Sequence, residues 1–185
     1  MNYRRWGGRY VIRKRTKNQL LMIGLVVGFL IGIVYENVAG TIFIFQTEYL
    51  KLFQEMSLDR KEYLFYILKV RVYPLIGIAF LWNFKWRKII TIFLVGWFGF
   101  FSGRLLVSAI LLQGIKGICL YIAVAFPHMV FYLFAYLILV FHLFSDRKQR
   151  WNKLKTIVLV LLFSLGIGCE VYINPQIVKR IIGWI

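Results

Sequence analysis

The segment Gln19–Tyr35 carries no charged side chain and is long enough to cross the roughly 30 Å hydrocarbon core of a bilayer as an α-helix. Four further apolar segments follow it, at about 63–84, 89–112, 118–144 and 156–173. No internal repeat or low-complexity linker separates them. The sequence therefore predicts an all-α polytopic membrane helical bundle with about five transmembrane helices, forming a single membrane domain over residues 19–185.

The composition excludes an ordinary soluble domain. Hydrophobic residues make up 61% of the 185 residues, whereas soluble domains contain about 45–50% apolar residues. The chain has 24 Lys and Arg residues against seven acidic ones, a net charge of +17. These basic residues cluster at the ends of apolar segments, which is typical of a membrane protein rather than of a nucleic-acid groove. We therefore expect membrane lipids as partners and no nucleic acid.

The basic residues also predict an orientation. Residues 1–18 form a basic arm without any acidic residue, and the segments after the second and fourth spans are basic as well. Together these three segments hold fifteen of the 24 Lys and Arg residues. By the positive-inside rule the arm is cytoplasmic, and five spans then place the carboxyl terminus outside. The first span is too long for a signal peptide, so we expect a retained anchor in a multi-pass cell-membrane protein.

The segment 36–62, between the first two spans, differs in character because it holds five of the seven acidic residues. Its apolar residues recur at spacings of three and four, which predicts an amphipathic helix; they are Ile42, Phe45, Tyr49, Leu52, Phe53 and Met56. This helix could lie on the outer membrane surface or dock on the bundle. Further along, Leu105–Lys116 could span the membrane or be re-entrant.

Three glycines lie on one face of the first span: Gly24, Gly28 and Gly32. A helix face without side chains lets a second helix approach closely, and close packing drives association in lipid. The second helix could belong to another copy of the chain, which would make this face a homodimer interface. Alternatively, it could be another helix of the same chain.

Among the ionisable residues inside predicted spans, Arg104, His128 and Glu170 are of most interest, and all three fall between the middle of the membrane and its outer face. A charge at this depth is costly unless it is paired or hydrated. We therefore expect an intramembrane polar cluster in which Glu170 pairs with Arg104 or His128. Such a cluster would serve as a structural clasp between helices or as a proton or ion pathway. Alternatively, the charged groups could extend to the outer membrane interface.

Catalytic and metal-binding motifs are missing from the sequence. There is no HExxH, no CxxC, no phosphate-binding loop and no GxSxG. Two histidines fourteen residues apart do not form a metal site, and there is no intramembrane pair of aspartates. We therefore expect no enzymatic activity, no metal and no cofactor.

Two stretches resemble the stage II sporulation protein M family. The first is VGWFGFFSGRLLVSAILLQGIKGICLYIAVAFPHMVFYLFAYLIL, residues Val95–Leu139, in which Pro127 and His128 match a Pro-His-Gly-x-x-Glu motif. Met129 and Tyr132 stand where that family usually has glycine and glutamate. The second is GCEVYINPQIV, Gly168–Val178, which is similar to the family's closing Glu-x-x-x-x-Pro element.

The resemblance implies a noncatalytic bacterial membrane protein that localises peptidoglycan-degrading partners during the engulfment step of sporulation. Those cell-wall hydrolases act outside the membrane, so segment 36–62 would be the docking surface, with Phe45, Tyr49, Leu52 and Phe53 as docking residues. The two departures from the motif leave room for a paralogue with another role. The alternative is a transporter or channel component, possibly of an ABC system, built around Arg104, His128 and Glu170.

Overall fold

The computed structural model describes residues 4–40, 42–57, 59–144 and 151–184; for residues 4–18 and Phe43 it describes the backbone alone. Every element in these ranges is helical. In chain order they are α1 (Arg4–Ala39), η1 (Phe43–Phe45), α2 (Thr47–Glu55), α3 (Arg60–Phe80), η2 (Leu81–Asn83), α4 (Arg87–Gln113), α5 (Ile115–Ala125), α6 (His128–Phe144), α7 (Lys153–Gly168), η3 (Cys169–Ile173) and α8 (Asn174–Ile182). The element η3 is a single turn of π-helix.

Four helical segments of the described chain are long and apolar enough to cross a membrane: Gln19–Ala39, Arg60–Asn83, Arg87–Gln113 and Lys153–Ile182. α5 and α6 meet the same requirement together but are bent by 58° at the break between them. They form a fifth span if the bent pair crosses as one. The expectation of an all-α bundle is therefore confirmed, and four or five of its helical segments have the length and apolar character of membrane spans.

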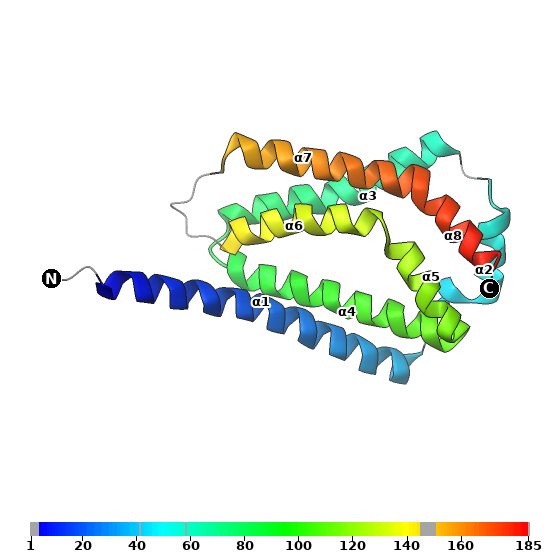
Figure 1. Ribbon diagram of the computed structural model, residues 1–185, viewed down its shortest axis with the longest axis horizontal. Helices are drawn as coiled ribbons and strands as arrows, with labels where there is room; N and C mark the ends of the chain where they lie inside the picture. Colours follow the sequence, from blue (N-terminus) through cyan, green and yellow to red (C-terminus); the bar gives the residue numbers. More distant parts are fainter. Residues whose placement is uncertain (1–3, 41, 58, 145–150, 185) are drawn as a thin grey trace.

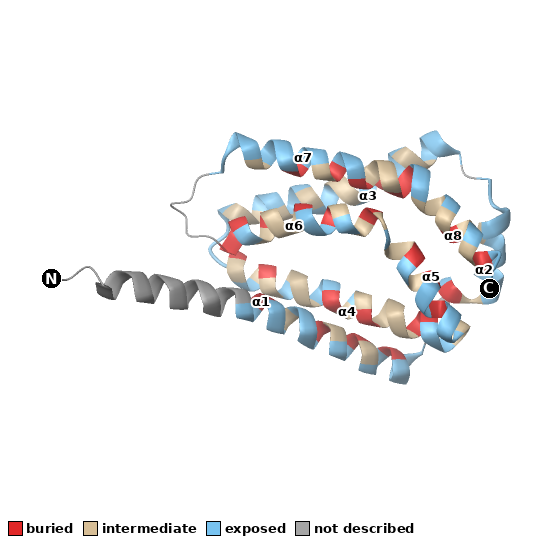
Figure 2. Cartoon of the chain, viewed as in Figure 1, coloured by how far each residue is buried: buried red, intermediate tan, exposed pale blue. Residues whose placement is uncertain are grey.

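The helices run lengthwise beside one another, as Figure 1 shows. α1, α4 and α7 run in one direction along the molecule, and α3 and the α5–α6 pair run in the other. The beginning of α1 and the end of α8 consequently lie at opposite ends of the bundle. Many side chains on the outer faces of α1, α3 and α7 are exposed and apolar, as expected where helices face lipid (Figure 2).

α1 and α4 pack backbone against backbone as a parallel pair. A methyl group added at Gly28 would overlap the Gly96 carbonyl oxygen, and one at Gly32 would overlap that of Phe100. The close approach is mutual, because a methyl group at Gly99 would overlap the Leu25 carbonyl. The glycine face of α1 is therefore occupied by another helix of the same chain, and the homodimer alternative is wrong for this face.

A second group of helices forms its own apolar core. Five buried residues of α6 and α7 make up this core: Tyr132, Ala135, Leu139, Leu159 and Phe163. α3 packs at its edge and contributes the half-buried Leu75 and Ile78. Most of α3 remains exposed, and Ile67 is its buried residue.

The short elements η1, α2, α5 and α8 form a cap at one end of the bundle (Figure 1). α5 folds back on α4 at Gly114, whose φ of 61° favours glycine. Gly117 then lies so close to the Ala109 carbonyl that a larger residue would overlap it. The core of the cap consists of the buried residues Phe45, Leu50, Leu120, Ala123, Val178 and Ile182, together with the buried Ala109 of α4.

At the opposite end of the bundle, aromatic side chains of several elements stack on one another. The Trp82 ring lies 4.0 Å from the His142 ring at an interplanar angle of 14°, and the Arg87 guanidinium lies 3.9 Å from the Trp82 ring centre. The Trp151 ring meets His142 edge-on at 4.6 Å. The stack ties together η2, α4, α6 and the start of the α7 region. The neighbouring basic residues Arg147, Lys148 and Arg150 lie outside the described residues, as do the side chains of the basic arm.

Several expected boundaries change in the structure. α1 continues to Ala39, past the expected end at residue 35, so Glu36 is helical. α4 continues unbroken to Gln113, so Leu105–Gln113 belongs to a helix of spanning length and the break falls after Ala125 instead. The amphipathic segment docks on the bundle as η1 and α2, rather than lying free on a surface.

Candidate functional site: two buried ion pairs

The first ion pair joins α1 to α4 next to the cap. Glu36 lies in the last turn of α1, and its side chain is fully buried. The Arg104 Nε donates to Glu36 Oε2 at 2.5 Å. α1 ends at Ala39, and the chain turns back at Gly40, whose φ of 98° suits glycine. This turn brings the Ile42 N–H within 2.6 Å of Glu36 Oε1.

Ser108 completes the first site. It lies one helical turn beyond Arg104 on α4, and its hydroxyl donates to Glu36 Oε1. The same hydroxyl oxygen accepts the Ile42 N–H at 2.9 Å. The Arg104 guanidinium also lies 4.9 Å from the Tyr35 ring centre, in the range of a cation–π contact. Both carboxylate oxygens of Glu36 therefore have partners, as a charge in this position requires.

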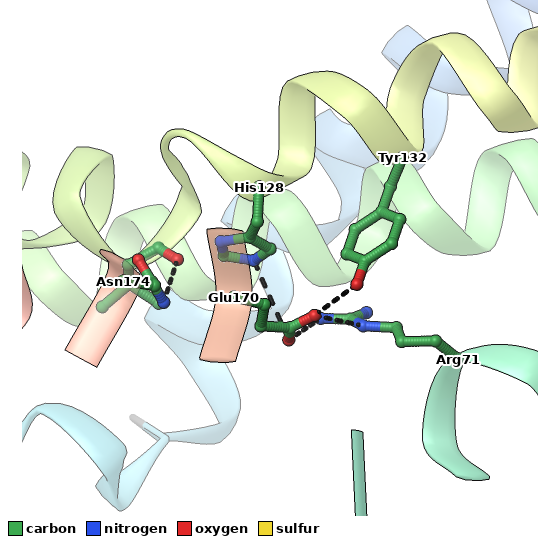
Figure 3. A network of polar contacts seen from close by, with 6 residues as sticks. Arg71, His128, Tyr132, Glu170 and Asn174 are labelled. Carbon is green, nitrogen blue, oxygen red and sulfur yellow. Dashed lines mark hydrogen bonds and ion pairs between the residues drawn. The ribbon is translucent and has the colours of Figure 1, made fainter. Parts of the chain in front are cut away.

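The second ion pair joins α3 to the π-helical turn η3. The Arg71 guanidinium donates two parallel hydrogen bonds to the Glu170 carboxylate, from Nη2 to Oε1 at 2.5 Å and from Nε to Oε2 at 3.0 Å. The Tyr132 hydroxyl on α6 donates to Glu170 Oε2 at 2.7 Å. Figure 3 shows these side chains converging on the carboxylate from α3 and α6. A two-pronged pair of this kind fixes geometry as well as charge.

His128 lies beside the second pair. Its Nε2 is 4.0 Å from Glu170 Oε1, and the side chain is 4% exposed. The His128 Nδ1 is buried without a hydrogen-bond partner in the described chain. His128 begins α6 immediately after the break in the α5–α6 span. In the orientation that satisfies both of its polar atoms, the Asn174 side-chain amide donates to the Ala123 carbonyl at 2.8 Å and to the Phe126 carbonyl at 3.2 Å, at the end of α5 and in the break itself. The break therefore lies directly against the buried carboxylate.

The structure brings together some of the predicted cluster but not all of it. His128 and Glu170 are neighbours, as expected. Arg104 is bound to Glu36 instead, and this corrects the expectation that Arg104 could pair with Glu170. The partner of Glu170 is Arg71, a residue that the sequence analysis did not single out.

Glu36 and Arg71 were both missed. Glu36 follows directly on an apolar segment, where a charge ordinarily faces water, whereas Arg71 lies within the second predicted span but was not considered as a partner. One signal was available for Arg71, because an acidic residue inside a span needs a base at similar depth and Arg71 lies inside the second predicted span. Glu36 gave no such signal, since it was assigned to the outer segment.

The four expected docking residues divide into two pairs. Phe45 is 1% exposed and Phe53 packs against the core of the cap, so neither is free for a partner, which corrects that part of the expectation. Tyr49 and Leu52 are 51% and 61% exposed and face away from the bundle. The helical period explains the division, because α2 must turn one face toward α5 and α8.

Comparison with protein families, with curated proteins and with solved structures gave no match to this chain. The resemblance of Val95–Leu139 and Gly168–Val178 to the stage II sporulation protein M family therefore stays a prediction.

The contribution of the Tyr132 hydroxyl can be measured directly. We expect Tyr132→Phe to lower the free energy of unfolding by about 1.5–3 kcal/mol, because it removes a hydrogen bond to a buried charged group and little else. Tyr136→Phe is the matched control, since Tyr136 packs in the same core and its hydroxyl has no hydrogen bond to a described residue. Thermal unfolding of the detergent-solubilised protein measures both. Equal stability of the two variants would show that the Tyr132–Glu170 bond is not formed.

Proposed function

We propose that this chain is a noncatalytic membrane scaffold that anchors a peptidoglycan-degrading protein at the outer face of a bacterial cell membrane, as in sporulation engulfment. In this proposal the amino terminus is cytoplasmic, the bent α5–α6 pair is the fourth of five spans, and the cap faces outward. The partner class comes from the family resemblance. The surface and the orientation are argued from the structure.

The distribution of basic residues along the sequence supports this orientation, because fifteen of the 24 Lys and Arg residues lie in the arm and in the segments after the second and fourth spans. The cap end holds six: Lys51, Arg60, Lys61, Lys116, Lys179 and Arg180. Four acidic residues lie around α2 and the beginning of α3, at the cap end: Glu48, Glu55, Asp59 and Glu62. Basic residues gather where α4 and α7 begin, at the other end: Lys85, Arg87, Lys88, Lys153 and Lys155. Membrane proteins keep such basic segments in the cytoplasm, and for this reason we propose the cap as the extracytoplasmic end.

The observation that carries the proposal is an apolar surface on the cap, which we call the outer patch. It consists of Tyr49 and Leu52 on α2, Met56 directly after α2, Ile115 on α5 and Trp184 after α8. Ile115 is 85% exposed and Trp184 71%. Contacts between the elements keep these residues together, since the Lys179 ammonium donates to the Met56 carbonyl and the Lys116 ammonium lies 5.9 Å from the Trp184 ring. Exposed aromatic and aliphatic side chains held on a rigid surface are typical of protein docking sites.

The two ion pairs support a structural role for the intramembrane charges. Each carboxylate is bound by an arginine of a different helix and by one hydroxyl. Glu36 joins α1 to α4, and Glu170 joins η3 to α3 and α6. An arrangement of this kind holds the spans in place beneath the cap, as a scaffold requires.

The test is direct binding through the outer patch. The full-length protein is purified in lipid nanodiscs, and partners recovered from the membranes of the source cells are identified and then produced pure. We expect a peptidoglycan hydrolase to bind the parent protein, and Leu52→Glu to weaken the binding by at least about tenfold, because it puts a charge into an apolar contact. Lys51→Glu is the matched control, since it introduces the same side chain one position away on the exposed flank of α2. Unchanged binding by Leu52→Glu would show that the outer patch is not the docking surface.

A transporter or channel component is the second candidate, and one observation favours it. The α5–α6 span is broken, and the break lies against a π-helical turn that carries a buried carboxylate. Broken helices and π-turns are common at the binding sites of transporters. Proton or solute flux in proteoliposomes that Glu170→Gln abolishes would favour this function over the scaffold.

A further inference from the structure

Most of α3 is exposed, and one stripe of its exposed residues, spaced by three and four positions, carries polar groups as well as apolar ones. Its members are Tyr66, Lys69, Tyr73, Ile76 and Phe80, and we call this stripe the α3 seam. The exposed fractions of the four aromatic and aliphatic members lie between 58% and 68%: Tyr66, Tyr73, Ile76 and Phe80. A stripe with this spacing is the one that left-handed helix pairs use to interlock their side chains.

Lys69 sets the α3 seam apart from an ordinary lipid-facing surface. It lies nine residues into the apolar segment Arg60–Asn83, about 14 Å along the helix axis. Arg71 follows two positions later, which places it about 200° around the helix, and there it meets Glu170. The two cations therefore point to opposite sides of α3. One is neutralised inside the chain, whereas Lys69 is exposed and forms no ion pair with a described residue.

The hydroxyls of two neighbouring tyrosines also lack a polar partner among the described residues. Tyr66 and Tyr73 lie one turn on either side of Lys69 on the α3 seam, and neither hydroxyl hydrogen-bonds to another described residue. Glu62, the nearest acidic residue on this face along the sequence, lies seven residues away, about 10 Å along the axis. Three polar groups at membrane depth thus face outward together, and polar groups in spans ordinarily face a protein partner or water.

We propose that the α3 seam binds a transmembrane helix of another protein, and that this helix carries an Asp or Glu side chain at the depth of Lys69. Ion pairing with Lys69 and hydrogen bonds to the two tyrosine hydroxyls would hold the carboxylate. Ile76 and Phe80 would pack against the apolar remainder of the partner helix. The inference does not rest on the proposed function, since the α3 seam lies on a different surface from the outer patch.

Two other occupants fit the α3 seam less well. A second copy of this chain in the same membrane orientation would bring Lys69 near its own counterpart across the two-fold axis, where like charges repel. A lipid phosphate could meet Lys69 if the side chain reached toward the headgroups. A headgroup contact would not account for the regular stripe, which continues to Phe80 at the far end of α3.

The test uses a synthetic leucine-rich transmembrane peptide with one Glu at the depth of Lys69, and an otherwise identical peptide with Leu there. Energy transfer between labelled full-length protein and labelled peptide is measured in phosphatidylcholine vesicles. We expect the Glu peptide to associate at least about tenfold more tightly than the Leu peptide, in the range of measured polar contacts between membrane helices. Lys69→Met should remove this difference and leave the thermal stability unchanged, because Lys69 is exposed. Lys61→Met, also exposed on α3, is the matched control and should preserve the difference.

Equal association of the two peptides, or a difference that survives in Lys69→Met, overturns the proposal. Binding of phosphatidylglycerol that requires Lys69, measured in the absence of peptide, would show that Lys69 binds a lipid headgroup. That result would overturn the proposal as well. Energy transfer between differently labelled copies that requires Lys69 would indicate self-association instead. In cells, a photocrosslinking residue at Tyr73 should capture a protein whose membrane segment contains Asp or Glu. An adduct whose segment lacks such a residue contradicts the proposal.

Discussion

Gly28→Ala should lower the free energy of unfolding by on the order of 3 kcal/mol, although alanine is the better helix former by about 1 kcal/mol. The added methyl group would overlap the carbonyl oxygen of Gly96, which belongs to the backbone of α4 and cannot rotate away. α1 would have to separate from α4 to relieve the overlap. That movement would also loosen the Glu36–Arg104 pair. Thermal unfolding of the solubilised protein, followed by tryptophan fluorescence, measures the loss.

Two further glycines serve as controls for this experiment. Gly77 lies inside α3 with open space around it, so Gly77→Ala should raise the stability by up to about 1 kcal/mol. Gly24→Ala should fall between the two, because the new methyl group would meet the Cγ2 methyl group of Ile92 at 3.2 Å, a contact that a shift of a few tenths of an ångström relieves. If Gly28→Ala proves as stable as Gly77→Ala, α1 does not pack on α4 as described.

The largest electrostatic effect is expected at the first ion pair. Arg104→Met leaves the fully buried Glu36 carboxylate without its cation, and breaking a buried pair in this way costs about 3–5 kcal/mol. For a chain of this length that loss corresponds to a fall in Tm of roughly 10 °C or more. Ser108 and the Ile42 N–H would still donate to the carboxylate, but neither neutralises it.

A double variant that replaces both Glu36 and Arg104 separates the contribution of the ion pair from that of side-chain packing. Replacing both partners, Glu36→Met with Arg104→Met, removes the stranded charge, so we expect it to be more stable than Arg104→Met alone. The double variant Glu36→Met with Arg71→Met is the control. Glu36 and Arg71 belong to different ion pairs, so the effects of the two substitutions on stability should add. Additive effects of Glu36→Met and Arg104→Met would contradict a direct bond between them.

The spans could be predicted because each one is a local property of the sequence. Long apolar segments with basic flanks need no partner to be recognised, and the glycine spacing of α1 showed correctly that a helix would approach there. Which helix it would be could not be read from Gly28 alone. Its partner Gly96 belongs to α4, and the choice depends on the arrangement of the whole bundle.

The candidate site was harder to predict, because charge pairing across a bundle leaves little trace in the sequence. Glu170 was correctly expected to need a partner, and Arg71, Tyr132 and His128 surround it. Arg104 was an equally reasonable partner by depth. Glu36 decided the pairing, but a carboxylate after an apolar segment looks like the beginning of an outer loop. In the structure it lies inside α1, and Arg104 neutralises it there.

The long sequence separation within the ion pairs has a consequence for the way this protein is made. Arg104 follows Glu36 by 68 positions, and Glu170 follows Arg71 by 99. At about 5–20 residues per second, a ribosome needs roughly 3–14 s to deliver Arg104 after Glu36 and a longer time to deliver Glu170 after Arg71. During these intervals one member of each pair has been synthesised and its counterpart has not. The nascent chain therefore depends on the insertion machinery, or on water at its lateral exit, to shelter a lone charge until the matching helix arrives.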